Sequence, residues 1–384
     1  MTSLSNPARR RTTWLLAAAA FVLAILLAEG AFRVAGIRPG FQARHPEHPR
    51  GLLIPHPTRG YTIAPGFSRV IQKPTGPITM YTDDLGLRYD GTPRVKGGRT
   101  LLAVGNSFTV GWGIDVQETW PGRLQHWLAA RGHTISVLNG GVWAYNMAQI
   151  RDRASELVEL LHPEVVIAAV YGRARYRMAD PYWNLDGILR FGSGAEKSRL
   201  TKGGYYFSPM YRRWMIETDF WLDEHFRLGA LAWKASYAAY ASLGSHESQE
   251  ALGEPAPTRA VADDPNMALL LDEVERLHRE TAAAGVPLVV MLVNPQEEDG
   301  SFLASEHDFN TLLREFCGLR GIPVVGPLER FEREAGAGDH SRFRLGSDHH
   351  WSPFANDLAA QAVAATLDSL GLLGRRRTSD RPAR

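Results

Sequence analysis

From Thr100 onward, apolar runs of strand length alternate with longer amphipathic segments, and this alternation constrains the fold more than any other feature. Strands that are apolar throughout are buried on both faces, as in a parallel sheet covered by helices. The predicted strands are residues 100–104, 135–138, 165–170, 287–293 and, shorter, 322–325. The predicted helices, with apolar residues three and four apart, are 120–131, 147–161, 267–284, 309–320 and 354–370. The pattern predicts a three-layer, doubly wound parallel α/β sheet.

Between the third and fourth predicted strands, residues 176–264 are too long for an ordinary connection and indicate an inserted subdomain or lid. Many of its aromatic residues recur at helical spacing, which predicts a small helical core; an aromatic wall for a sugar, or a surface resting on a bilayer, is the alternative. These residues are Tyr205, Tyr206, Tyr211, Trp214, Phe220, Trp221, Phe226, Trp233, Tyr237 and Tyr240.

The N-terminus has the pattern of a membrane anchor. Arg9, Arg10 and Arg11 precede an apolar stretch over residues 14–28, which favours a cytoplasmic N-terminus and an extracytoplasmic remainder. A cleaved signal peptide is the alternative, because residues 28–30, Ala-Glu-Gly, form a tolerable small-x-small cleavage site.

The chain is therefore divided as follows: 1–33 cytoplasmic tip and anchor, 34–98 extended lead-in with short β-like pieces at 61–63 and 78–81, 99–175 α/β domain, 176–264 insertion, 265–373 α/β domain continued, and 374–384 tail. A net charge of +2 gives no support for a nucleic-acid partner. The single cysteine, Cys317, excludes an internal disulfide or a multi-cysteine metal site and is predicted to pack in the core.

Two segments carry candidate chemistry. Ser107 follows the first predicted strand, at the carboxyl edge of the sheet where such folds place their active sites. Asp348 and His350 stand just before the last predicted helix, for which Ser352 is the expected N-cap and Pro353 the first residue. A serine needs a neighbouring base to become a nucleophile, so we expect His350 to deprotonate Ser107 and Asp348 to orient His350.

The oxyanion formed in such an attack needs donors aimed at it, and the candidates are a backbone N–H of Asn139-Gly140-Gly141 and that of Ser107. Each signal alone has a plainer interpretation: Gly-Asn-Ser at a strand end is usually a turn, and an exposed Asp-His pair is usually a cap or an ion pair. Their combination, each at a strand end or before a helix, favours an active site.

These motifs resemble the SGNH (GDSL-type) hydrolase superfamily, especially its membrane-anchored branch of DHHW and alginate O-acetyltransferase-like envelope proteins. The resemblance spans residues 81–370 and rests on Asp84-Leu85-Gly86-Leu87-Arg88, Gly105-Asn106-Ser107, Gly111-Trp112-Gly113, Asn139-Gly140-Gly141, Asn294-Pro295 and Asp348-His349-His350-Trp351. It implies Ser107 as nucleophile, Gly141 as oxyanion donor, His350 as base and Asp348 as its acid. His349 is then a substrate contact or a structural residue.

The sequence departs from the family at two positions. Asn106 stands where the family more often has Asp, an isosteric change. The family's oxyanion asparagine should follow Gly172, but Arg173 is found there. Loss of one oxyanion donor typically costs about 10² to 10³ in rate. Arg173 is either a solvated strand end, a substitute donor, or a contact for an acidic sugar or phosphate.

The leading hypothesis is a serine esterase or O-acyltransferase that acts on a cell-envelope glycan ester or a small acyl ester, without cofactor or metal. By analogy with the acetyltransferase-like relatives, a polytopic membrane partner would deliver the acyl group. The alternatives are a catalytically weakened binding or assembly protein, suggested by the missing asparagine, and a metal-dependent phosphoesterase with Asp348, His349 and His350 as ligands.

Overall fold

A computed structural model describes residues 7–36, 51–73, 75–91, 98–178, 182–185, 188–191, 199–202, 205–207, 225–229, 232, 261–296, 301, 304–335, 340–346 and 348–374. The chain divides into two compact units. One comprises residues 1–49 and 207–249, and the other residues 50–206 and 250–384.

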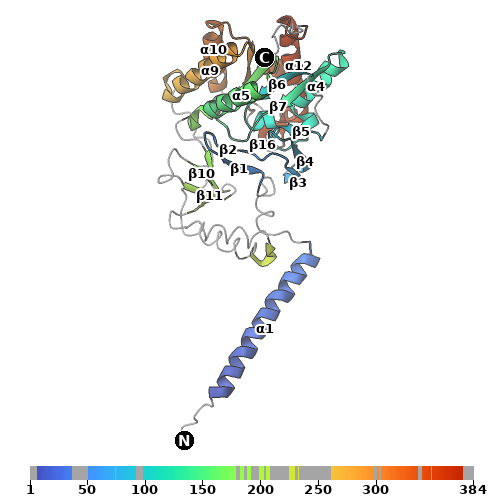
Figure 1. Ribbon diagram of the computed structural model, residues 1–384, viewed down its shortest axis with the longest axis vertical. Helices are drawn as coiled ribbons and strands as arrows, with labels where there is room; N and C mark the ends of the chain where they lie inside the picture. The colour runs from blue at the N-terminus through green and yellow to red at the C-terminus, as the bar shows by residue number, and fades with distance from the viewer. Residues whose placement is uncertain are drawn as a thin grey trace, which may run out of the picture. The chain divides into compact units, whose positions relative to one another are not determined.

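An eight-stranded sheet is the framework of the second unit (Figure 1). Its strands, in spatial order, are β14 (Val324–Val325), β13 (Leu288–Val293), β8 (Val165–Tyr171), β6 (Arg99–Val104), β7 (Ile135–Asn139), β5 (Arg88–Tyr89), β4 (Gly76–Thr82) and β3 (Ser68–Lys73). The first five are parallel, and counted along the chain they have the order 5-4-3-1-2 of a flavodoxin-like doubly wound sheet. The predicted fold class is confirmed.

The sheet is longer than the sequence indicates. The lead-in, predicted only as extended chain with β-like pieces, adds the antiparallel strands β3, β4 and β5 beside β7. Ile71, Ile78 and Met80 of these strands are buried in the core. The lead-in is therefore an integral part of the α/β domain.

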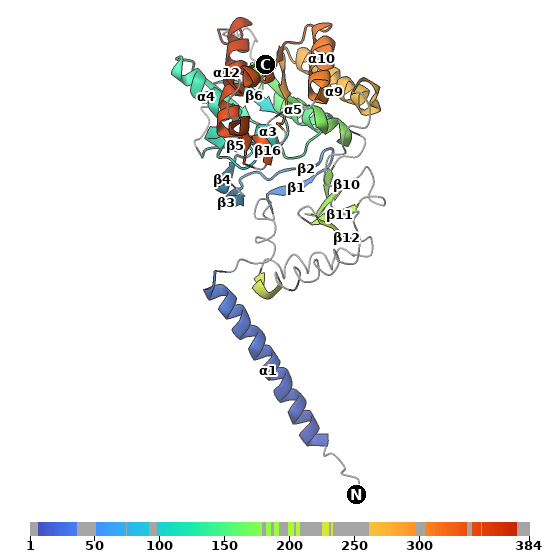
Figure 2. The same cartoon turned by 180° about the vertical axis from the view of Figure 1, so that it is seen from behind.

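Helices cover both faces of the sheet because its strands are apolar on both sides (Figure 2). One face packs against α5 (Met147–Leu161), α9 (Pro265–Ala283) and α10 (Ala304–Gly318), where Cys317 is fully buried as predicted. The other packs against α4 (Trp120–Ala130), α11 (Leu328–Ala335) and α12 (Pro353–Ser369). The short α3 (Ser107–Val110) follows β6 directly. Of these elements, α3 and α11 were not predicted.

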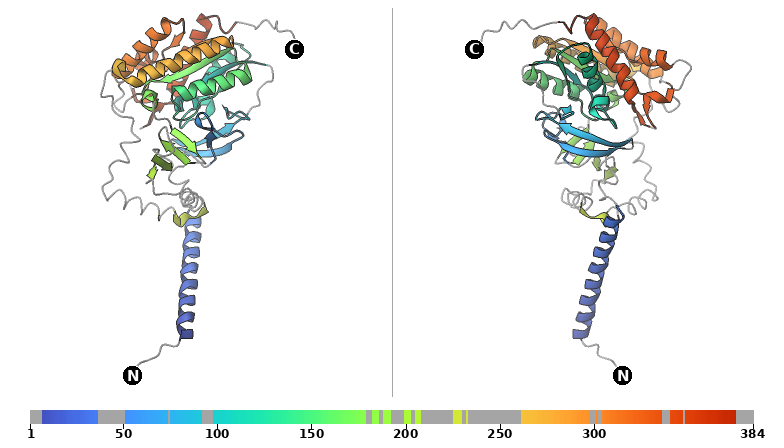
Figure 3. Two further views of the ribbon diagram at one scale, coloured as in Figure 1. Left: turned by 60° about the vertical axis from the view of Figure 1, so that its left-hand side comes forward. Right: turned by 90° about the vertical axis from the view of Figure 1, so that its right-hand side faces the viewer.

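The first part of the insertion is β-structure. Strands β9 (Tyr182–Leu185), β10 (Ile188–Phe191), β11 (Arg199–Lys202) and β12 (Tyr205–Phe207) form a four-stranded sheet, and β9 lies beside the hairpin of β1 (Leu53–His56) and β2 (Gly60–Ile63) (Figure 3). The helical core predicted for the insertion does not extend to these residues, because short strands are hard to distinguish from helix by apolar spacing alone. Most of its aromatic residues lie outside the described part of the chain.

In the first unit, α1 (Pro7–Val34) contains a span of 24 residues, Arg11–Val34, that is long and apolar enough to cross a membrane. Its C-terminal end is bound to residues 225–229. The Glu29 carboxylate accepts the backbone N–H groups of Arg227 at 2.7 Å and Leu228 at 3.1 Å. Arg33 donates to the His225 carbonyl at 3.0 Å. This part of the insertion thus folds onto the helix that follows the N-terminus.

Candidate active site

The carboxyl ends of the parallel strands β6, β7, β8 and β13 lie at one edge of the sheet, and each is followed by a predicted site segment. After β6, the chain turns through Gly105 into α3, with Ser107 as the first helical residue. The buried Asn106 is the N-cap, and its side chain accepts the Phe108 N–H at 3.2 Å. Asn106 therefore fixes the turn that presents Ser107, and the sequence-based suggestion that it also contacts substrate or the oxyanion stays a proposal.

The candidate base and acid lie on a short hairpin, β15 (Arg344–Leu345) and β16 (Asp348–Trp351). The hairpin is fixed at its end by α12, where Ser352 accepts the Ala355 N–H at 3.2 Å and Pro353 is the first helical residue, as predicted. The Trp351 indole donates to the Asn294 carbonyl after β13 at 2.8 Å. The hairpin is thereby held against the carboxyl edge of the sheet.

Ser107, His350 and Asp348 are in contact. The Ser107 Oγ lies 2.7 Å from His350 Nε2, and His350 Nδ1 lies 2.6 Å from Asp348 Oδ1, which also accepts the His350 backbone N–H at 3.0 Å. Partial burial of the Asp348 carboxyl opposes its ionisation, but the hydrogen bonds and charge of His350 prevail and hold its pKa well below the usual range. A carboxylate that orients an imidazole toward a hydroxyl is the arrangement that activates a serine.

Aromatic side chains hold the His350 ring. Phe108 lies 4.7 Å away between centroids, and Trp112 stacks on the ring at 5.5 Å and 27°. The Trp112 indole N–H also donates to Asp348 Oδ2 at 2.8 Å. Trp112 thus contacts both the acid and the base, a role that the motif Gly111-Trp112-Gly113 does not indicate by itself.

Arg88, from the first quoted motif, is fully buried and anchors the end of α3. Its guanidinium donates to the carbonyls of Val110 at 2.7 Å, Gly111 at 2.8 Å and Ile114 at 2.8 Å. Burial lowers the pKa of Arg88 to about 10, with Asp115 opposing the shift, so the side chain stays charged at neutral pH. Arg88 therefore positions the helix that carries Ser107.

The loop after β7 contains the predicted oxyanion donor. The Gly141 N–H donates to the Asn139 side chain at 3.1 Å, so Gly141 would serve an oxyanion only by exchanging this bond. Gly140, Val142 and Tyr145 donate to backbone carbonyls.

Ala144 differs from the rest of this loop. Its φ of 56° is in the left-handed region, which is unusual for alanine and is found more often at functional sites. Among the described residues, neither the Ala144 N–H nor the Ser107 N–H meets an acceptor. Ala144 is thus a second donor candidate, which the sequence could not indicate because alanine gives no sign of its backbone conformation.

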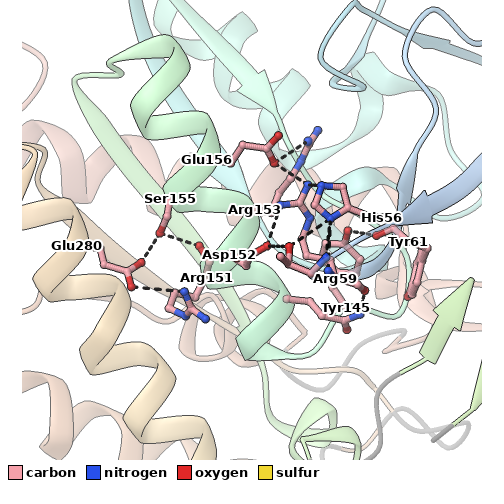
Figure 4. A network of polar contacts seen from close by, with 12 residues as sticks. His56, Arg59, Tyr61, Tyr145, Arg151, Asp152, Arg153, Ser155, Glu156 and Glu280 are labelled. Atoms are coloured by element: carbon pink, nitrogen blue, oxygen red, sulfur yellow. Dashed lines mark hydrogen bonds and ion pairs between the residues drawn. The ribbon is translucent and has the colours of Figure 1, made fainter. Parts of the chain in front are cut away.

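A polar network lies beneath this loop (Figure 4). The Tyr61 hydroxyl of β2 donates to the Trp143 carbonyl at 2.6 Å, and the Tyr145 hydroxyl donates to the Tyr61 carbonyl. The buried Arg59 pairs with Asp152 of α5 at 3.0 Å. The loop is therefore held by the lead-in, which is itself bound to α5.

After β8, Arg173 occupies the place of the family's asparagine. Its Nε pairs with Glu306 Oε1 at 3.2 Å, and the fully buried Glu306 also accepts from Asn294 at 3.1 Å. Burial raises the pKa of Glu306, while Arg173 lowers it. Arg173 is therefore an ion-pair partner of α10 in this structure, and a role toward substrate remains a proposal.

His349 faces a pocket of about 360 Å³, which is lined by Thr75, Trp112, Gly113, Arg344, Leu345, Asp348 and His349. Partial desolvation and the positive charges of His350, Arg173 and Arg344 lower the pKa of His349, against the opposing charge of Asp348, so its ring is neutral at physiological pH. His349, Asp348 and His350 have potential metal-ligand atoms within 4.8 Å of one another, but Asp348 and His350 are hydrogen-bonded to each other. This geometry suits activation of Ser107 better than metal binding.

Together, the flavodoxin-like sheet and the Ser–His–Asp contact at its carboxyl edge define the class, an α/β protein with the site geometry of a serine hydrolase. No family model matches the chain, and no curated protein matches it.

Solved structures that resemble it include GDSL-type hydrolases and esterases. TesA shares 15% identity over 71% of this chain and 99% of its own, with a TM-score of 0.41. A putative lipolytic protein of the G-D-S-L family from Desulfitobacterium hafniense shares 11% over 70% and 99%, with a TM-score of 0.41. The acetyl xylan esterase AlAXEase shares 12% over 70% and 99%, with a TM-score of 0.39.

Proposed function

We propose that this chain is an SGNH-type serine hydrolase that cleaves or transfers acyl esters. The observation that carries the proposal is the continuous contact from Ser107 Oγ through His350 to Asp348, with distances of 2.7 and 2.6 Å. These distances fall within the range for a nucleophile and its general base.

In the proposed reaction, His350 Nε2 takes the Ser107 proton as Oγ attacks the acyl carbonyl carbon. The Ser107 amide and the loop after β7, through Ala144 or through Gly141 after exchange of its bond, stabilise the oxyanion. His350 then protonates the leaving alkoxide, which departs as an alcohol and leaves an acyl-serine. Water or a sugar hydroxyl, deprotonated by His350, attacks the acyl carbonyl carbon. The bond to Ser107 Oγ then breaks, His350 returns the proton to Oγ, and the acid or the new ester leaves.

We further propose that the enzyme is retained at a bacterial inner membrane by α1, with its catalytic domain outside the cytoplasm and an envelope glycan ester as substrate. Support for retention comes from Glu29, which is bound to residues 227 and 228. Cleavage after residue 30 would remove this carboxylate. A polytopic acyl-donor partner remains part of the proposal for the transferase activity.

The proposal can be tested with the full-length protein in detergent and a fluorophosphonate probe, which labels activated serines. We expect labelling of the wild type and loss of labelling in Ser107→Ala and His350→Ala. Ser155→Ala is the matched control, because the Ser155 hydroxyl donates to the Arg151 backbone carbonyl on α5 and to the Glu280 carboxylate on α9 rather than to a histidine. Absence of labelling in folded wild type would overturn the proposal.

A binding or assembly protein is the second candidate, favoured by the ion pair that engages Arg173 where an oxyanion asparagine is expected. In that case Ser107→Ala would leave the envelope phenotype unchanged, while deletion of the insertion would abolish function. The hydrolase is favoured because the triad contacts are intact.

A further inference from the structure

Trp112 connects the candidate acid and base to a third charged group. Its indole N–H donates to Asp348 Oδ2 at 2.8 Å and its ring stacks on His350. On the ring itself lies the ammonium group of Lys73, 3.4 Å from the ring centroid. Lys73 is only 6% exposed, so solvent screens its charge weakly.

Lys73 comes from outside the parallel part of the sheet. It is the last residue of β3, in the antiparallel lead-in, and its ammonium also lies 5.6 Å from the Trp143 ring. Thr75, two residues further, donates to the Gly113 carbonyl at 2.5 Å and lines the pocket beside His349. The β3–β4 connection thus meets the segment that follows α3.

We propose that Lys73 acts on the triad through Trp112 as a positioning residue that sets the pH range in which His350 is a free base. The inference rests on the proposed hydrolase function. A cation on the face of an indole withdraws electron density from the ring, which makes the N–H a stronger donor to Asp348. When Asp348 accepts a stronger hydrogen bond from Trp112, its carboxylate becomes less basic and stabilises the imidazolium of His350 less.

The charge of Lys73 also opposes the appearance of a second positive charge on His350. The other groups around this ring are Asp348 and His349 on β16, with Arg173 after β8 and Arg344 on β15 acting on His349. Asp348, which accepts a hydrogen bond from the ring, favours the imidazolium, whereas we expect the ammonium of Lys73 to oppose it. Lys73 therefore extends activity toward acidic pH.

The experiment measures kcat/KM for p-nitrophenyl acetate from about pH 5 to about pH 9, with the full-length protein in detergent. In Lys73→Met we expect the midpoint of the acidic limb to rise by about 0.5 to 1 pH unit. Lys73→Arg, which keeps the cation on the ring, should restore the wild-type midpoint. Arg69→Met is the matched control, because it removes one positive charge from an exposed position of the same strand.

A second measurement does not need catalysis. The Nδ1 proton of His350, in its short hydrogen bond to Asp348, should give a far-downfield proton resonance whose pH dependence reports the ionisation of the ring directly. We expect the same upward shift in Lys73→Met. An unchanged midpoint by both measurements, in a protein that unfolds at the wild-type temperature, would show that Lys73 only packs on Trp112. A wild type without esterase activity but with the expected resonance shift would overturn the proposed function and leave this inference standing.

Discussion

Asp348 satisfies three donors at once: the ring N–H and the backbone N–H of His350, and the Trp112 indole N–H. The carboxylate therefore fixes both the orientation of the base and the shape of the hairpin that carries it. An acceptor at this position also selects the tautomer of His350 with its proton on Nδ1, which leaves Nε2 free to accept the Ser107 proton.

We expect Asp348→Asn to lower kcat for ester hydrolysis by about 10² to 10⁴, because an amide can stabilise the wrong tautomer and cannot stabilise an imidazolium. Steady-state kinetics at neutral pH would measure the loss. Asp357→Asn is a matched control, since Asp357 also accepts an indole N–H, that of Trp127 at 3.0 Å, on the helix α12. Equal losses in both variants would mean that Asp348 has only a structural role.

The same carboxylate makes the fold sensitive to acid. The pKa of Asp348 is lower in the folded protein than its ordinary value of about 3.9. The unfolded chain therefore binds this proton more readily, so the stabilisation is complete above pH of about 5 and is lost as the pH falls. Denaturant unfolding of wild type and Asp348→Asn should be compared at several pH values. The difference between their free energies of unfolding should shrink toward about pH 3, roughly one unit below the ordinary pKa of an aspartate. A constant difference would contradict the assignment of the shift to Asp348.

At the scale of elements, α3 is one turn long and cannot be stable alone, so its position depends on its surroundings. Arg88 of β5 holds α3 in place by donating to the carbonyls at the C-terminal end of this helix. The antiparallel part of the sheet thus contributes to the site through Arg88 as well as through Lys73.

Arg88→Met should destabilise the fold by about 2 to 4 kcal/mol, because it leaves several buried carbonyls without a donor. It should also slow fluorophosphonate labelling of Ser107, since α3 loses its anchor. Arg99→Met is the control: its partly exposed ion pair with Glu164 at 2.7 Å is expected to contribute less than about 1 kcal/mol. Thermal unfolding and labelling rates measure both effects, and an Arg88→Met protein as stable as the control would rule out the anchoring role.

The parallel strands and their helices could be predicted from sequence because their apolar periodicity is strong and local. The strands β3 to β5 could not be assigned to the sheet, because their pairing with β7 depends on contacts between residues as distant as Arg88 and Asn139. In the site, residue types with distinctive chemistry, Ser107, Asp348 and His350, were found by motif. The roles proposed for Ala144, Trp112 and Lys73 depend on backbone conformation or on contacts with a ring, which residue type alone does not indicate.

At the scale of the whole molecule, the insertion is divided between the two compact units. Its first strands belong with the α/β domain, whereas residues 207–249 belong with the N-terminal helix. Residues 225–229 bind the end of α1 through Glu29 and Arg33, while most side chains before Glu29 in the span are exposed, as expected of a surface that faces lipid.

We expect the mature protein to retain α1. Intact-mass analysis of membrane-extracted protein should show the N-terminal helix, and a bifunctional thiol reagent should link Phe32→Cys to Arg227→Cys, whose native residues share a hydrogen bond of 3.1 Å. Val22→Cys paired with Arg227→Cys is the control. Cys317 does not interfere, because burial raises its pKa to about 12. A mature N-terminus near residue 30 would show that α1 is a signal peptide.

The contact between Ser107 and His350 joins residues 243 positions apart in the sequence. During synthesis the nucleophile emerges from the ribosome long before its base, and the insertion is made in between. At a rate of about 5 to 20 residues per second, this interval lasts on the order of 10 to 50 s. Throughout it the serine is an ordinary hydroxyl, so a stalled or truncated chain is inert toward esters. Because of this order along the chain, Ser107 cannot be activated until His350 has been synthesised and the α/β domain has folded.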